Sequence, residues 1–239
     1  MKINIKGIDI NYVQYGAGKD VILLHGWGQN IEMMKPLGDR LKNKKITIID
    51  FPGFGLSEEP KEAYTIYDYC EILEELVKKL KIKNPILIGH SFGGRVAICY
   101  ASRNKVDKLV LFGSPCVRLQ KKLPLKVKIL KWLKRLPGMD RIGEYAKKFI
   151  GSRDYKNASV MMRQILVNTV NEDLSECAKM IKVPTLLIWG ENDTEATVEE
   201  AKLLENLLDD GALIVLEHAT HYAYLEQLPR VIGILNNFI

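Results

Sequence analysis

The sequence predicts an α/β protein with a doubly wound, mostly parallel sheet of eight strands and an inserted helical cap. Short runs rich in Ile, Leu and Val recur along the 239 residues, and most end in Gly, Pro or a polar residue. Helix-compatible stretches lie between these runs, which is typical of βαβ units with right-handed crossovers. Residues 116–175 break this alternation because they hold helical patterns without a convincing strand, which indicates an insertion.

Eight strands are expected, two in a hairpin and six in the parallel part of the sheet. The first 16 residues alternate polar and apolar side chains, which favours a β-hairpin at one edge. Continuous apolar runs are instead typical of parallel strands buried on both faces. The six such runs cover residues 21–26, 46–53, 85–91, 108–115, 184–190 and 212–218.

A helix is expected to begin after Thr65, because Asp68 follows three residues later as in a capping box. Apolar residues then recur at helical spacing. The alternating part of the chain, residues 1–115 and 176–239, is assigned to the core, and residues 116–175 are assigned to a cap. We expect the cap to cover the carboxyl ends of the strands, where open α/β sheets bind their ligands.

Positive charge is concentrated in the predicted cap. The chain has a formal net charge of +6, but residues 116–156 hold 13 basic and 3 acidic side chains, so the rest of the chain is net acidic. The overall charge therefore does not indicate a nucleic-acid-binding surface, and no nucleic-acid partner is expected.

The chain has the features of a cytoplasmic protein. Its four cysteines are scattered without a C-x-x-C pair, which fits reduced thiols. The N-terminal residues lack the apolar core of a signal peptide, and no apolar run reaches transmembrane length. We therefore expect no transmembrane segment.

Residues 86–97, ILIGHSFGGRVA, place a serine at a sharp turn between a buried strand and a helix. The central residue of such a turn is forced towards positive φ, and its neighbours must be small. Gly89 and Gly93, two residues before and after Ser91, meet that requirement. The Ser91 hydroxyl would then lie beside a helix N-terminus, as a nucleophile does. A purely structural glycine-rich turn explains the motif equally well on its own.

A serine nucleophile needs a base and an acid that orients the base, in the chain order Ser, Asp or Glu, His. Asp193 and His221 follow two later apolar runs and supply that order. Glu191 is a rival for the acid, although the G-x-x-D spacing favours Asp193. His218 is an alternative to His221 and could instead be a structural histidine, and H-x-x-H alone is a poor zinc site, so no metal is assigned.

Five ordered motifs resemble the alpha/beta hydrolase superfamily, in its cap-bearing serine-nucleophile branch: HGWGQN, DFPGFGLSEEP, GHSFGG, PTLLIWGENDT and EHATHYAYLEQLP. The resemblance spans nearly all of the chain except the cap. It implies that Ser91 is the nucleophile, His221 the general base and acid, and Asp193 the residue that holds the imidazole tautomer. It also implies an oxyanion hole made by the backbone N–H groups of Trp27 and Phe92, and a reaction without a metal or organic cofactor.

The resemblance and the serine nucleophile together imply acyl chemistry. We expect a carboxylic ester hydrolase that cleaves esters or thioesters of a small acyl substrate through an acyl-enzyme. A carbon–carbon bond hydrolase or lyase of the same fold is the alternative, and Arg95 directly after the elbow is a feature of those groups. Arg95 could equally be a structural ion-pair partner. A non-catalytic receptor or binding module of this fold is the alternative from another class.

Candidate pocket residues are His25, His90, Trp132 and Tyr222. Trp132 belongs to the stretch KKLPLKVKILKWLKRLPG, which can form an amphipathic basic helix. The plain interpretation is that its apolar side covers the pocket while its lysines are solvated. The sharper hypothesis is that its basic face binds an acyl carrier protein, as in the pimeloyl-carrier methyl esterases that the chain resembles, or an anionic lipid surface.

Overall fold

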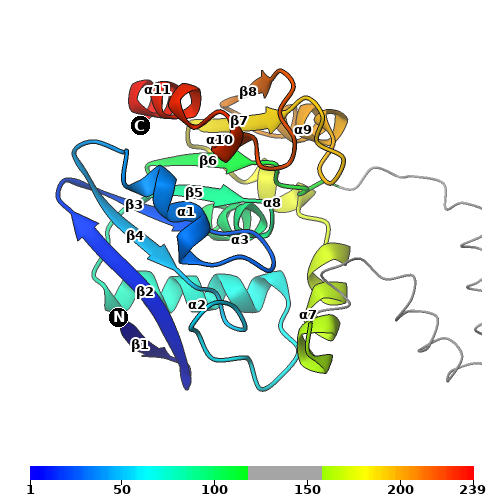
Figure 1. The fold of residues 1–239 in the computed structure, drawn as a ribbon. Helices are drawn as coiled ribbons and strands as arrows, with labels where there is room; N and C mark the ends of the chain where they lie inside the picture. Colours follow the sequence, from blue (N-terminus) through cyan, green and yellow to red (C-terminus); the bar gives the residue numbers. More distant parts are fainter. Residues whose placement is uncertain (118–157) are drawn as a thin grey trace, which may run out of the picture.

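The computed structural model describes residues 1–117 and 158–239, which form one sheet with helices on both faces (Figure 1). The strands are β1 (Lys2–Ile5), β2 (Ile8–Gly16), β3 (Lys19–Leu24), β4 (Lys44–Ile49), β5 (Ile86–His90), β6 (Lys108–Phe112), β7 (Thr185–Gly190) and β8 (Gly211–Leu216). The helices are α1 (Ile31–Gly38), α2 (Ile66–Lys79), α3 (Phe92–Ala101), α7 (Val160–Asn171), α8 (Ser175–Lys179), α9 (Val198–Glu205), α10 (Ala223–Glu226) and α11 (Leu228–Phe238).

The eight strands lie in the order β1-β2-β4-β3-β5-β6-β7-β8. β1 pairs with β2, and β2 with β4, in the antiparallel sense, whereas every pairing from β4 to β8 is parallel. The predicted fold class is therefore confirmed: a mostly parallel, doubly wound sheet with a hairpin at one edge.

The sheet divides the apolar interior into two cores. Helices α1, α10 and α11 pack on one face, and α2, α3, α8 and α9 pack on the other. Side chains alternate between the faces along each strand, so in β3 Val21 and Leu23 enter one core while Ile22 and Leu24 enter the other. Both faces are covered, which explains why the parallel strands appear in the sequence as continuous apolar runs.

Helix α2 begins where the capping box predicts. The Thr65 hydroxyl accepts a hydrogen bond from the Asp68 N–H at 3.3 Å, and the Asp68 carboxylate accepts one from the Thr65 N–H at 2.7 Å. The Glu172 carboxylate, just after α7, accepts a further bond from the Ile66 N–H at 2.8 Å. The start of α2 is thereby joined to the end of α7.

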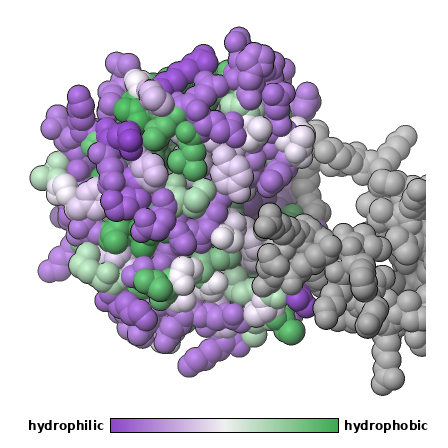
Figure 2. Space-filling view, in the orientation of Figure 1, coloured by the Kyte–Doolittle hydropathy of each residue, from purple (hydrophilic) through white to green (hydrophobic). Residues whose placement is uncertain are grey.

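Helix α7 lies on the side of the sheet to which the arrowheads of β5 and β6 point (Figure 1). It falls within residues 116–175, the range assigned to a cap, but residues 118–157 lie outside the described residues. The predicted pocket residue Trp132 and the whole basic stretch around it, residues 121–138, lie outside them as well. Figure 2 shows that the described surface facing the viewer is mostly hydrophilic, with small hydrophobic groups scattered over it. Among residues 1–117 and 158–239, no helix has the length and apolar character needed to cross a membrane.

Candidate active site

Ser91 stands between β5 and α3 in a strained conformation, with φ 50° and ψ −112°. A Cβ atom at Gly93 would lie 2.3 Å from the Leu24 carbonyl oxygen, and one at Gly89 would lie 2.6 Å from the Gly94 backbone. Neither position has room for a side chain, so the turn requires both glycines. The Ser91 side chain makes no capping hydrogen bond to α3. The packing therefore holds a hydroxyl at the carboxyl end of the central strand without using it structurally.

Asp193 and His221 form a buried hydrogen-bonded pair. His221 Nδ1 lies 2.8 Å from Asp193 Oδ2, and the two residues are 7% and 5% exposed. The other carboxylate oxygen, Oδ1, accepts hydrogen bonds from the Glu195 and Ala196 N–H groups, each at 2.9 Å. Because both oxygens are engaged, the carboxylate is fixed in orientation. It favours the imidazole tautomer that carries its proton on Nδ1 and leaves Nε2 able to accept a proton.

The two rival residues form a separate pair on the surface. The Glu191 carboxylate accepts a hydrogen bond from the His218 N–H at 2.9 Å and lies 3.7 Å from His218 Nδ1. The His218 side chain is 91% exposed. Asp193, not Glu191, contacts the His221 ring.

The loop that carries His221 is joined to the strand that precedes Ser91. His90 Nε2 lies 3.0 Å from the His221 carbonyl oxygen, and the two imidazole centroids are 4.8 Å apart. In the part of the chain that the structure describes, no hydrogen bond joins the Ser91 hydroxyl to His221, whose Nε2 instead lies 3.5 Å from Glu195 Oε2. Nucleophile and base are often not hydrogen-bonded before substrate binds.

The backbone N–H groups of Trp27 and Phe92 have no acceptor among residues 1–117 and 158–239. Their aromatic rings pack edge to face with centroids 5.5 Å apart. Phe92 is the first residue of α3, so its N–H belongs to the free N-terminal group of that helix. Both donors are thus available to an oxygen that gains negative charge.

His25 is a structural residue of the core. It is fully buried, its Nδ1 lies 2.7 Å from the Gly26 carbonyl oxygen, and its Nε2 accepts a hydrogen bond from the Phe51 N–H at 3.0 Å. Burial lowers its pKa from 6.5 to about 4. Protonation of Nε2 would bring a second donor against the Phe51 N–H, so the neutral ring is the form that fits.

His90 is likewise buried, between the Gln29 side-chain oxygen at 3.3 Å and the His221 carbonyl oxygen at 3.0 Å. Burial, followed by the charge of the neighbouring His221, lowers its pKa to about 3. His25 and His90 are predicted as possible pocket residues; both rings are inaccessible and fix loops beneath the site, and a part in shaping the pocket floor stays a prediction. Tyr222 is 38% exposed, and its ring centroid lies 5.4 Å from that of His90 and 5.7 Å from that of His221.

These two histidines are expected to make the fold sensitive to acid. Their pKa values are lower in the folded state than the unfolded value of 6.5, so the unfolded chain binds protons first as the pH falls. The free energy of unfolding should therefore decrease as the pH is lowered through about 6.5. The total decrease between about pH 7.5 and pH 5 should be up to about 4 kcal/mol. Urea unfolding across this range measures the loss. In His25→Gln the loss should be about half as large, whatever the variant's stability at neutral pH, and an unchanged loss would contradict the assignment.

Arg95 holds helices together from within the protein. Its guanidinium donates hydrogen bonds to the carbonyl oxygens of Pro115, of Thr169 at 2.8 Å and of Glu172 at 2.5 Å. The residue is only 5% exposed. Arg95 therefore joins α3 to the segment after β6 and to the end of α7 through backbone carbonyl groups.

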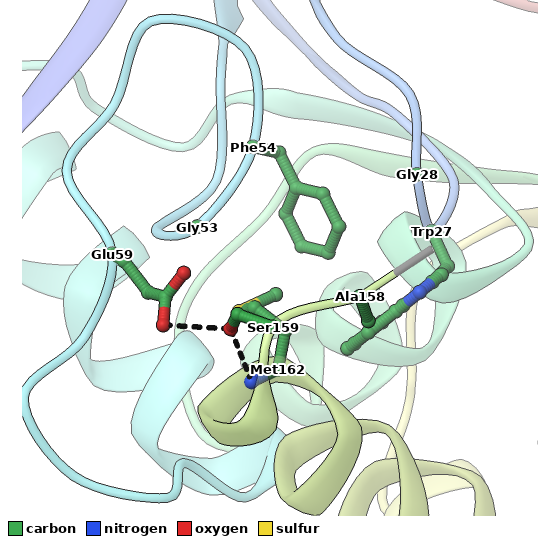
Figure 3. A pocket seen from close by; sticks show the side chains of 8 residues that line it. All are labelled: Trp27, Gly28, Gly53, Phe54, Glu59, Ala158, Ser159 and Met162. Atoms are coloured by element: carbon green, nitrogen blue, oxygen red, sulfur yellow. Dashed lines mark hydrogen bonds between the residues drawn. The ribbon is translucent and has the colours of Figure 1, made fainter. Parts of the chain in front are cut away.

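A cavity of about 290 Å³ opens beside Trp27, and it is surrounded by two loops and the start of α7 (Figure 3). The Trp27 and Phe54 rings pack edge to face with centroids 4.9 Å apart. The Ser159 hydroxyl donates to the Glu59 carboxylate at 2.8 Å and accepts a bond from the Met162 N–H at 3.1 Å. The cavity therefore has an aromatic side and one acidic corner. It is lined by Trp27, Gly28, Gly53, Phe54, Glu59, Ala158, Ser159 and Met162.

Sequence reasoning missed two residues of this site, Gly113 and Glu195. Gly113, with φ 47°, passes so close to the Asp193–His221 pair that a Cβ there would lie 3.0 Å from Asp193 Oδ2 and from His221 Nδ1. Its signal was the glycine directly after a buried strand. Glu195 had no signal beyond its position two residues after Asp193, because its approach to His221 depends on the path of the loop.

The chain belongs to the alpha/beta hydrolase fold family, whose model matches residues 20–142, just over half of the sequence. The fold and the order of the site residues along it agree with this membership.

Several relatives show what this chain is similar to. It is 29% identical over 281 residues to a proline iminopeptidase of Saccharolobus solfataricus, covering 98% of this chain and 90% of that protein. It is 23% identical to a pimeloyl-[acyl-carrier protein] methyl ester esterase of Aliivibrio fischeri, covering 94% and 95% of the two chains. An esterase structure from Exiguobacterium antarcticum matches with a TM-score of 0.78 and 24% identity over 98% of this chain and 96% of that one, which shows the shared fold.

Proposed function

We propose that this hydrolase cleaves carboxylic esters or thioesters through an acyl-enzyme formed on Ser91. The observation that carries the proposal is the buried hydrogen bond of 2.8 Å between His221 Nδ1 and Asp193 Oδ2, in a fold that also holds Ser91 at positive φ. A carboxylate that fixes the imidazole tautomer leaves Nε2 ready to take a proton from an alcohol. A protein that only binds its ligand has no need of such a pair.

In this mechanism Ser91 Oγ attacks the carbonyl carbon of the substrate while His221 Nε2 takes the hydroxyl proton. The oxyanion that forms is stabilised by the N–H groups of Trp27 and Phe92. The carbon–oxygen or carbon–sulfur bond then breaks, and the imidazolium gives its proton to the departing alcohol or thiol. Water, deprotonated by the same Nε2, attacks the acyl-enzyme and releases the acid and the free serine.

The cavity beside Trp27 is proposed to bind part of the substrate next to the oxyanion donors. Its aromatic and methionine side chains suit an apolar acyl chain, and about 290 Å³ is the size of a small-molecule site. We further propose that residues 116–175 form a cap over this site. Docking of an acyl carrier protein or an anionic lipid surface on their basic side chains stays a prediction from the sequence, because residues 118–157 lie outside the described residues.

The alternatives receive less support from the described residues. Arg95, the residue that pointed to a carbon–carbon hydrolase or lyase, is occupied with backbone carbonyl groups, including those of Thr169 and Glu172. A receptor without catalysis would not require the Asp193–His221 hydrogen bond.

A fluorophosphonate probe tests the proposal directly, because it reacts only with an activated serine. We expect the probe to add to Ser91 at neutral pH, as located by peptide mass spectrometry, and to leave Ser91→Ala unlabelled. A panel of esters, thioesters, amides and ring-fission diketones, with Ser91→Ala as the blank, would then identify the bond that is cleaved. Absence of a Ser91 adduct in the folded wild-type protein would overturn the proposal.

A further inference from the structure

A second carboxylate faces the outer nitrogen of His221. Asp193 occupies Nδ1, and Glu195 Oε2 lies 3.5 Å from Nε2 on the opposite side of the ring. The two acids differ in environment, because the Asp193 side chain is inaccessible whereas that of Glu195 is 65% exposed. Asp193 therefore holds His221 from the buried side. Glu195 lies on the exposed side, from which a substrate would reach His221 Nε2.

The backbone under Glu195 is firmly anchored. Its N–H donates to Asp193 Oδ1 at 2.9 Å, and the next residue, Ala196, accepts a hydrogen bond from the buried Trp189 indole at 2.9 Å. Thr197 then starts α9 with a capping box. Movement of the Glu195 carboxylate relative to Nε2 is therefore limited to rotation of its own side chain about an anchored Cα atom.

The position of this charge relative to the reaction follows from the proposed mechanism. The leaving atom must come within hydrogen-bond reach of Nε2 to receive its proton. The Glu195 carboxylate is then at most about 6.5 Å from the leaving atom, given its 3.5 Å separation from Nε2. Within residues 1–117 and 158–239 Glu195 has no lysine or arginine partner, and the basic side chain that it faces is His221.

We propose that Glu195 determines leaving-group specificity by favouring substrates whose alcohol or thiol carries a positive charge. This inference rests on the proposed function, because it uses Nε2 as the proton donor to the leaving group. A cation two or three bonds beyond the leaving oxygen lies within reach of the carboxylate, and an anion placed there is repelled. At such a separation in solvent, the attraction between the two unit charges should raise kcat/KM for a cationic substrate roughly fivefold over that for a neutral one.

The test compares two esters of one acid that differ in charge but not in shape. Butyrylcholine carries a quaternary ammonium, and 3,3-dimethylbutyl butyrate replaces its nitrogen by carbon. We expect the wild-type ratio of kcat/KM, cationic over neutral, to be roughly five times the ratio in Glu195→Gln, and we expect Glu195→Lys to favour the neutral ester. The wild-type preference should also shrink as salt is raised.

Glu191→Gln is the matched control, because Glu191 lies in the same loop but pairs with His218. Its ratio should equal that of the wild type. An equal ratio in wild type and Glu195→Gln, with Ser91-dependent cleavage intact, would overturn the specificity inference alone. Failure of the wild type to cleave either ester above the Ser91→Ala blank would overturn it as well, and labelling of Ser91 by the fluorophosphonate would then show whether the proposed function also fails.

Discussion

Replacing His221 by alanine is expected to lower kcat/KM for a cleaved ester by about four to six orders of magnitude. In the proposed mechanism the imidazole takes the Ser91 proton, and without it the hydroxyl is a weak nucleophile at neutral pH. The rate at which a fluorophosphonate labels Ser91 should fall in parallel, since that reaction also needs an activated serine. Steady-state kinetics and the labelling rate measure the two effects independently.

His218→Ala is the matched control for this variant. His218 lies three residues before His221 in the sequence. Its side chain is 91% exposed and interacts with Glu191. Its removal should change kcat/KM by less than about twofold, as surface substitutions away from a site do. A loss of similar size in both variants would contradict the assignment of His221 as the base, provided that thermal unfolding shows both proteins to be folded.

Asp193→Asn is expected to lower kcat by about 10⁴-fold while leaving the fold intact. An asparagine has only one oxygen, and the N–H groups of Glu195 and Ala196 require an acceptor at the position of Oδ1. The amide NH₂ must then take the place of Oδ2 and donate to His221 Nδ1. The imidazole proton shifts to Nε2, which can no longer accept the proton of Ser91.

Glu191→Gln separates this effect from a general change of charge in the loop. Glu191 contacts His218 and not the His221 ring, so the variant should keep a kcat within about twofold of the wild type. A wild-type kcat in Asp193→Asn, or a large loss in Glu191→Gln, would reverse the choice between the two acids.

The sequence predicted those parts of the fold that depend on local patterns. Apolar runs located the parallel strands because a strand covered on both faces cannot alternate with polar residues. Thr65 and Asp68 located the start of α2 because a capping box is made within four residues. Gly89 and Gly93 indicated the bend at Ser91 because their spacing expresses a steric requirement of that bend.

Features made by distant segments were beyond sequence reasoning. The cavity combines residues near positions 27, 53–59 and 158–162. No local pattern in any of these segments indicates that it contacts the other two. The burial of His25 and His90 follows from how loops fold over them, which the sequence around these residues does not indicate. Glu195 reaches His221 only because Asp193 Oδ1 turns the intervening loop back on itself.

The hydrogen bonds of Arg95 and Glu172 have a mechanical consequence. Arg95 joins α3, which starts directly after Ser91, to the end of α7, and Glu172 joins that same end to the start of α2. Helix α7 also supplies Met162 to the cavity wall. A substrate that contacts Met162 therefore touches a helix whose far end is hydrogen-bonded both to the helix that follows Ser91 and to the start of α2.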